Sequence, residues 1–261
     1  MDKFKVIDLF SGIGGFSLGL EETGHFETVA FCEIEKYPQK ILKKHWPDVP
    51  IYEDVKNVTA ERLRTDGVIS NGDRIVVTGG FPCQDISVAG HQKGITAERS
   101  GLWSELHRLI GELRPDYAIV ENVSALLSGG NGRWFGRVLG DLAEIGFDAR
   151  WYSIQAADMG APHRRNRVWI VADTSSTRGK IRLSEERYRE KGNTKKPNDS
   201  SSRTGRWEKQ NYWATEPNVG RVANGIPNRV DRLKCLGNAV VPKIATLLGD
   251  TIIQHESERN S

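Results

Sequence analysis

Three groups of side chains in the sequence could act together on one substrate. Cys83 follows a proline in residues 79–84 (GGFPCQ), Glu121 begins the triplet ENV, and Arg165 and Arg167 stand in RNR. A partly exposed cysteine at a strand-to-loop junction can become a thiolate nucleophile. A carboxylic acid can supply a proton, and a guanidinium can hold a carbonyl oxygen. Because a lone cysteine is more often a small core residue, the combination carries more weight than Cys83 alone.

These three groups match the requirements of one reaction. Carbon 5 of a cytosine ring is a poor nucleophile. Addition of a thiolate at carbon 6 makes carbon 5 enamine-like, provided that ring nitrogen N3 is protonated as the thiolate attacks. Cys83 would be the thiolate, Glu121 the acid and an arginine the group that holds the ring carbonyl.

A glycine-rich turn near the N-terminus could bind a cofactor. Residues 8–15 (DLFSGIGG) join a strand-like run to a helix-like stretch. Glycines allow the backbone to turn tightly and approach a ligand, and the helix start offers free N–H groups. Glu33 could accept hydrogen bonds from ribose hydroxyls, and Asp54 could bind an adenine amino group. Alone, the turn or either acid could be a tight corner or a solvated strand end; together they favour an adenosine-containing cofactor.

Strands and helices are expected to alternate along the part of the chain that holds these residues. The expected strands cover residues 5–10, 28–32, 74–78, 117–120 and 168–172. A first helix is expected after the glycine turn, ending near residue 22, and three more over 36–46, 102–113 and 134–145. This alternation predicts an α/β fold with a doubly wound, mainly parallel sheet of Rossmann-like type. Ligands bind at the carboxyl ends of such strands. Glu33, Cys83 and Glu121, each expected just past a strand end, should therefore meet at one rim.

Composition sets limits on the class of protein. Of 261 residues, 38% are hydrophobic and 27% charged, as in soluble globular proteins. No run of about 18 apolar residues is present, so no membrane span is expected. The N-terminus resembles no secretory signal, which predicts a cytoplasmic protein. Three widely spaced cysteines without zinc-like Cys/His spacing predict neither a disulfide framework nor a metal site.

Positive charge is concentrated after residue 173. Residues 178–209 contain eleven Lys/Arg and five Asp/Glu, a net charge of +6. Such a block is expected of an element that binds a polyanion, but a solvated linker has the same composition. The segment has too few apolar residues for a core of its own, so it is either disordered alone or ordered against a partner.

Five motifs, in order, make the sequence similar to the cytosine-C5 DNA methyltransferase family. DLFSGIGG resembles the family's cofactor loop, FPCQ its nucleophile motif, ENV its acid motif, RRNRVWIV its arginine motif and LGNAVVP the C-terminal motif that completes the cofactor pocket. The resemblance runs from Asp8 to Pro242. It implies methyl transfer from S-adenosylmethionine, without a metal, to carbon 5 of a cytosine flipped out of double-stranded DNA, because a ring inside the duplex cannot be reached.

The resemblance also implies a role for individual residues. Cys83 would attack carbon 6, Glu121 would contact N3, Arg167 would bind the ring carbonyl, and Arg165 would support the nucleophile or the target phosphate. Ile34 would pack on the adenine ring and Asn238 would close the cofactor pocket. The full cofactor set implied is Phe10, Gly12, Gly14, Glu33, Ile34, Asp54, Pro82, Leu102 and Asn238.

Residues 84–103 resemble the family's loop that closes over DNA. Its polar and charged side chains suit contact with phosphates and a groove of DNA. Ala89, near the tip, would fill the gap left by the flipped base. The expected DNA contacts are Ser87, Ala89, Gln92, Lys93 and Arg99. The chain would divide into a catalytic and cofactor-binding domain (1–173), a short basic target-recognition segment (174–217) and a return to the catalytic domain (218–261), with the last ten or so residues frayed.

Two departures from the family pattern affect recognition. His163 stands where the arginine motif usually has glutamine, and either side chain can form a hydrogen bond. The recognition segment is short, as in small phage or prophage members, so sequence selectivity could be loose. A monomer is the expected state, and such an enzyme could be paired with a cognate restriction endonuclease or act alone.

Four other functions share part of this pattern. An RNA cytosine-C5 methyltransferase would use the same cysteine and acid, although Gln84 and the basic segment favour DNA. A weakly active or silent DNA-binding relative could have the same fold, although Cys83, Glu121 and Arg167 are all present. An amino-group methyltransferase would need an Asp/Asn-Pro-Pro-aromatic loop that the sequence lacks. A Rossmann dehydrogenase would share the glycine turn but has no use for FPCQ with ENV.

Overall fold

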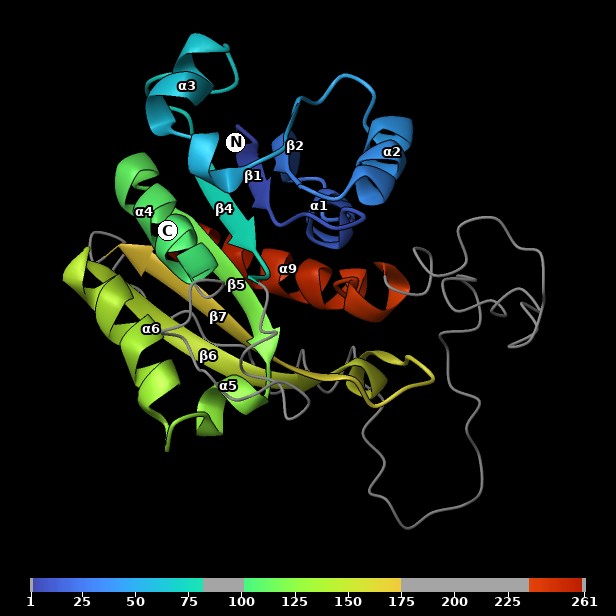
Figure 1. Ribbon diagram of the computed structural model, residues 1–261, viewed down its shortest axis with the longest axis vertical. Coiled ribbons are helices and arrows are strands. Elements are labelled where there is room, and N and C mark those ends of the chain that lie inside the picture. Colours follow the sequence, from blue (N-terminus) through green and yellow to red (C-terminus); the bar gives the residue numbers. More distant parts are fainter. Residues whose placement is uncertain (1, 82–100, 175–234, 260–261) are drawn as a thin grey trace.

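One sheet of seven strands forms the centre of the protein (Figure 1). The computed structural model describes residues 2–81, 101–174 and 235–259. Within them the strand order is β3-β2-β1-β4-β5-β7-β6. Strands β1 to β5 pair in parallel, whereas β7 is antiparallel to both β5 and β6. The predicted mainly parallel α/β sheet is therefore confirmed, with an antiparallel hairpin at one edge.

The elements alternate along the chain as the sequence predicts. The strands are β1 (Phe4–Leu9), β2 (Phe26–Cys32), β3 (Ile51–Tyr52), β4 (Ile75–Gly79), β5 (Tyr117–Val123), β6 (Phe147–Gln155) and β7 (Asn166–Thr174). The helices are α1 (Gly15–Glu21), α2 (Lys36–His45), α3 (Ala60–Thr65), α4 (Gly101–Leu113), α5 (Ala125–Ser128), α6 (Arg133–Glu144) and α9 (Pro242–Arg259), with 3₁₀ turns η1 (Val55–Asn57) and η3 (Ala156–Met159).

Two apolar cores cover the two faces of the sheet. One joins alternate strand residues such as Ile7 to α3, α4, α5 and α6, and it contains the buried indole of Trp103. The other joins residues such as Val6 to α1 and α9, with Phe16 and Ile244 among its members. Because successive strand side chains point to opposite faces, both faces of these strands are apolar, as a doubly wound sheet requires.

Two expectations about element ends are wrong. Strand β5 was expected to end at Val120, but it continues to Val123 because β7 pairs with it through Val123 and Arg167. The last ten or so residues were expected to fray, but α9 continues to Arg259, and Glu256 is buried. The carboxyl group of Glu256 accepts hydrogen bonds from Arg74 (2.6 Å) and from the Tyr117 hydroxyl (2.5 Å).

This polar contact fixes α9 against the sheet. Burial alone would raise the pKa of Glu256, but the hydrogen bonds from Tyr117 and Arg74 outweigh it and hold that pKa below its usual value. In the described part of the chain, one helical segment is long and apolar enough by composition to cross a membrane. It covers residues 235–259, which include α9, and its mean hydropathy reaches 1.2. Because α9 packs into the second core and binds Arg74, a core helix accounts for this composition.

Helices α1 and α9 approach closely at Gly19. A Cβ atom on Gly19 would lie 2.1 Å from the Pro242 carbonyl oxygen and 2.7 Å from the Ala245 Cβ. We expect Gly19→Ala to lower the free energy of unfolding by roughly 1–3 kcal/mol, because the added methyl group forces the two helices apart. Urea denaturation measures this.

Gly136 provides the matched control for this substitution. It lies on the exposed side of α6, and a Cβ there would meet nothing within 4 Å. Gly136→Ala should raise the free energy of unfolding by up to about 1 kcal/mol through helix propensity. Equal stability of Gly19→Ala and the wild type would show that α1 and α9 are not held at this distance.

Candidate active site

The carboxyl ends of four neighbouring strands lie at one rim of the sheet. Leu9, the last residue of β1, pairs with Cys32 of β2 and with Gly79 of β4, and Gly79 also pairs with Val120 of β5. The residues that come directly after these paired positions therefore lie side by side. They are the glycine turn, Glu33, Gly80 and Glu121. The prediction that residues from separate strands meet at one rim is confirmed for the described ones.

A cavity of about 480 Å³ opens at this rim. Its wall contains most of the residues proposed for the cofactor and for the base. Those residues are Phe10, Gly12, Glu33, Ile34, Asp54, Leu102, Glu121, Arg165, Arg167 and Asn238. Gly14 does not line the cavity. It packs against Trp46: a Cβ added to Gly14 would lie 2.7 Å from an atom of the Trp46 ring. One continuous space thus joins the two sets of residues.

The glycine turn is held to the end of β2. The Ser11 N–H donates to the Cys32 carbonyl (3.1 Å), and the Gly12 N–H donates to Glu33 Oε2 (2.8 Å). Phe10 has φ 54, a left-handed conformation that a non-glycine residue adopts rarely and chiefly at functional sites. The turn is therefore fixed with its backbone against the cavity before any ligand binds.

Glu33 is placed to accept further hydrogen bonds. Its Oε1 atom accepts from the Glu35 N–H (2.8 Å) while Oε2 accepts from Gly12. Burial raises the pKa of Glu33, and these N–H groups oppose the increase. Because a carboxylate can accept about four hydrogen bonds, Glu33 keeps capacity for the ribose hydroxyls that the sequence predicts.

Asp8 lies beneath the turn, and sequence reasoning gave it no role. Its two carboxyl oxygens accept hydrogen bonds from the hydroxyls of Ser17 in α1 and Thr78 in β4, each at 2.8 Å. Complete burial raises its pKa to about 7, although both hydroxyls oppose the increase. Asp8 thus connects β1, α1 and β4 under the cofactor loop. A charged residue inside an apolar strand run was the available signal.

The far end of the cavity suits an adenine ring. Ile34 is 67% exposed and lines the cavity, so its apolar side chain is available to pack on a ring. Asp54 begins η1, where one of its oxygens accepts the Lys56 N–H (3.0 Å). Its other oxygen is free of that bond and can accept from an amino group. Leu102 and Asn238 line the same space.

Glu121 is the buried acid of the cavity. It is 8% exposed and lies within β5, opposite Trp169 of β7, and not past the strand end as expected. The Arg167 Nε atom lies 2.9 Å from Oε1 as an ion pair, but the geometry is not that of a hydrogen bond, and Oε1 accepts none. Burial raises the pKa of Glu121, against the opposing charges of Arg167 and Arg165.

Two neighbouring residues position the acid and the segment that leads to Cys83. A Cβ on Gly80 would lie 3.1 Å from Glu121 Oε2, so a larger residue there would press on the carboxyl group. Asn122, which sequence reasoning quoted in ENV without a role, donates from Nδ2 to the Phe81 carbonyl (3.3 Å). Phe81 is thus fixed to β5 two residues before the predicted nucleophile.

Several predicted residues lie outside the described part of the structure. They are Pro82 and Cys83, the DNA-contact residues Ser87, Ala89, Gln92, Lys93 and Arg99, and the basic segment 178–209. Among the residues that are described, no group of three His, Cys, Asp or Glu side chains could hold a metal ion.

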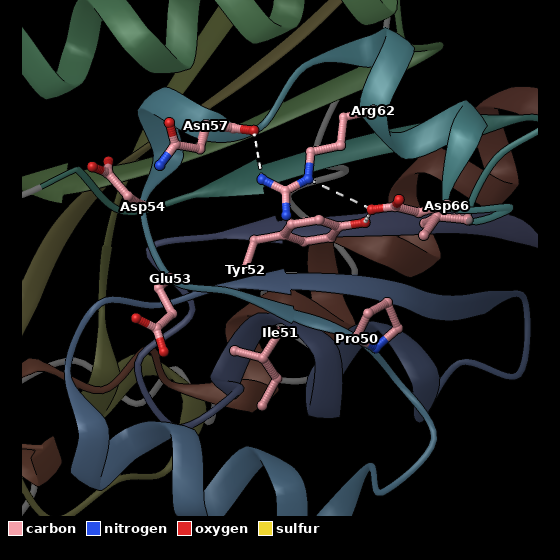
Figure 2. A pocket seen from close by; sticks show the side chains of 9 residues that line it. Pro50, Ile51, Tyr52, Glu53, Asp54, Asn57, Arg62 and Asp66 are labelled. Carbon is pink, nitrogen blue, oxygen red and sulfur yellow. Dashed lines mark hydrogen bonds and ion pairs between the residues drawn. The ribbon is translucent and has the colours of Figure 1, made fainter.

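A second hollow, also about 480 Å³, lies beyond β3 (Figure 2). There the Tyr52 hydroxyl donates to Asp66 (2.7 Å), and the Arg62 guanidinium lies over the Tyr52 ring, 5.0 Å from its centroid. Arg62 also donates to the Asn57 carbonyl (3.1 Å). These side chains bind one another and hold the loop that carries Asp54. The hollow is therefore a weaker candidate for a ligand site.

The strand order, the glycine turn and the cavity at the carboxyl ends of the strands place this chain in the Rossmann-like α/β class. Within that class, the chain belongs to the C-5 cytosine-specific DNA methylase family, whose model matches residues 4–220.

Individual relatives agree with this assignment. The chain is 37% identical over 172 residues to the type II methyltransferase M2.BsuMI of Bacillus subtilis, covering 64% of this chain and 41% of that protein. It is 35% identical over 169 residues to M1.ScrFI of Lactococcus lactis, covering 65% and 41%. A crystal structure of an E. coli prophage protein, to which DNA modification methyltransferase activity is attributed, aligns with TM-score 0.58 and 27% identity, covering 69% and 49%. The chain thus spans less than half the length of these relatives.

Proposed function

We propose that this protein transfers a methyl group from S-adenosylmethionine to carbon 5 of a cytosine flipped out of double-stranded DNA. The observation that carries the proposal is one continuous cavity in which the cofactor loop faces Glu121, a buried acid paired with Arg167. A buried carboxyl group held beside arginines in such a cavity is a candidate catalytic acid. Family membership supplies the reaction type.

The side chains supply the proton and the orientation that the reaction needs. S-adenosylmethionine, when bound, supplies an electrophilic methyl group. The Cys83 thiolate forms a bond to carbon 6 while Glu121, whose pKa is raised by burial, gives a proton to N3. Arg167, next to Glu121, holds the ring carbonyl. After methylation a base removes the proton from carbon 5, the sulfur–carbon bond breaks, and N3 returns its proton to Glu121.

The remaining parts of the proposal concern partners and organisation. Double-stranded DNA would be bound by residues 84–103 and by the basic block 178–209, whose net charge is +6. We propose residues 1–173 and 218–261 as the catalytic and cofactor-binding part, 174–217 as the recognition segment, and a monomer that acts in the cytoplasm, with or without a cognate restriction endonuclease.

Bisulfite sequencing tests the proposal directly. DNA from a host without cytosine methylation, after expression of the full chain, should contain 5-methylcytosine in a restricted sequence context. The same assay on host RNA separates the RNA methyltransferase alternative. If the chain is soluble and folded but the DNA stays unmethylated, the proposed activity is wrong.

A further inference from the structure

The side chain of Arg165 connects two walls of the cavity that are far apart in sequence. One terminal nitrogen (Nη1) donates to the Gly237 carbonyl at 2.5 Å, and the other (Nη2) donates to the Asn238 carbonyl at 3.0 Å. The same Nη2 atom lies 3.8 Å from Oε1 of Glu121. One rigid guanidinium therefore touches both the acid and the segment that begins the C-terminal part, 72 and 73 residues further along the chain.

The contact between Arg165 and Glu121 is largely buried, whereas the carbonyls of Gly237 and Asn238 belong to exposed residues. The Arg165 side chain is 14% exposed and that of Glu121 is 11% exposed. Burial lowers the pKa of Arg165, the positive charge of Arg167 lowers it further, and Glu121 opposes both. In such a site the planar fork of arginine can serve two carbonyls and a carboxylate at once, which a lysine ammonium cannot do with the same geometry.

The two walls belong to different parts of the cavity. Asn238, Ala239 and Val240 line it on the side of the cofactor loop. This segment packs directly on α1, since a Cβ on Gly15 would lie 2.6 Å from the Val240 carbonyl oxygen. Glu121 lines the part proposed for the target base. The guanidinium of Arg165 therefore contacts residues of both parts of the cavity.

Arg167 differs from Arg165 in this respect. Its Nε atom lies 2.9 Å from Glu121 Oε1, and its Nη1 atom donates to the carbonyl of its own neighbour, Asn166, at 3.0 Å. Both contacts of Arg167 are thus local to β5 and β7. The proposed contact with the ring carbonyl therefore falls to Arg167, and the link between the two walls falls to Arg165.

We propose that Arg165 is a positioning residue that couples cofactor binding to target-base binding. A cofactor seated against Asn238 fixes the two carbonyls, these fix the guanidinium, and the guanidinium fixes the Glu121 carboxyl group for the ring. The proposal rests on the proposed function. Because coupling is reciprocal, DNA that holds the acid in place must strengthen cofactor binding by the same factor.

A binding cycle with S-adenosylhomocysteine tests the coupling without any turnover. Calorimetry on the full chain gives the affinity for S-adenosylhomocysteine with and without a duplex that carries the methylated sequence context. In the wild type we expect the duplex to strengthen that affinity about tenfold. In Arg165→Lys, which keeps the positive charge but loses the fork, the factor should fall to less than about twofold.

The controls separate coupling from a structural role. Arg164→Lys changes an exposed neighbour and should leave the wild-type factor intact. Combined with Glu121→Gln, Arg165→Lys should reduce the factor no further, because both residues act on the same link. If Arg165 had a purely structural role, Arg165→Lys would weaken the binding of S-adenosylhomocysteine and of the duplex alike. The factor by which the duplex strengthens S-adenosylhomocysteine binding would then keep its wild-type value, and this result would overturn the proposal. If Arg165→Lys unfolds, the Glu121→Gln cycle alone decides, because a full tenfold factor in that variant equally rules out the link.

The two proposals fail in different ways. Binding of both ligands by the wild type, with no effect of one on the other, overturns the coupling and leaves the proposed function intact. No binding of S-adenosylhomocysteine by the folded wild type overturns the proposed function together with the coupling.

Discussion

Cys83→Ala is expected to abolish methyl transfer, lowering its rate by at least about 10⁴-fold, because the substitution removes the proposed nucleophile. Binding of S-adenosylhomocysteine should stay at the wild-type level, since the substitution removes only the sulfur atom. A duplex that contains 5-fluorocytosine gives the sharpest measurement. The fluorine on carbon 5 cannot leave as a proton does, so with S-adenosylmethionine the wild type should form a protein–DNA adduct that survives denaturation, and Cys83→Ala should form none.

Mapping the adduct identifies the sulfur atom. The chain has three cysteines, and the two that lie in the described residues, Cys32 and Cys235, line the cavity. Burial, followed by repulsion from Glu33, Asp54 and Asp8, raises the pKa of Cys32 to about 12, so its thiol stays protonated at neutral pH. Mass spectrometry of the digested adduct should place the nucleotide on the peptide with Cys83. An adduct on the Cys235 peptide, or full trapping by Cys83→Ala, would show that the nucleophile has been misassigned.

The sheet could be predicted where strands are buried on both faces. The β1, β4, β5 and β7 segments are mostly apolar because helices cover both of their faces. The strands that sequence reasoning missed, β3 and β6, lie at the two edges of the sheet, and helices α3, α5 and α9 were not predicted either. Strand β6 reads FDARWYSIQ with only its first and eighth residues buried, and β3 has two residues. An edge element buries little, so it lacks the apolar period that predicts buried strands and helices.

The site could be predicted wherever a residue follows its strand directly. Glu33 and the glycine turn depend on local order along the chain, and both line the cavity as expected. Contacts between distant segments could not be predicted. The extension of β5 through Glu121 needs β7 as a partner, and the hydrogen bonds of Arg165 reach Gly237 and Asn238 in the C-terminal part. No local pattern encodes pairings of that kind.

Glu121→Gln is expected to slow methyl transfer by roughly 10²–10⁴-fold. The amide fills the same space against Gly80 and can still form a hydrogen bond to N3, but it has no proton to transfer as the thiolate attacks. Addition at carbon 6 then leaves negative charge on the ring, which Arg167 only partly offsets. Single-turnover kinetics on a methylatable duplex measures the chemical step, and the thermal unfolding midpoint shows that the variant is folded. Glu144→Gln, which removes an exposed carboxylate at the end of α6, is the matched control and should keep the wild-type rate.

The pH dependence of the same variant separates proton transfer from simple binding. Burial raises the pKa of Glu121 despite the nearby arginines, so its protonated fraction is higher near neutrality than that of an exposed glutamate, and it falls as the pH rises through the raised pKa. The wild-type rate should therefore decrease on the alkaline side as this proton is lost. Glutamine does not titrate, so Glu121→Gln should lose that alkaline decrease. An alkaline decrease of the same midpoint in both proteins would mean that a different group donates the proton to N3.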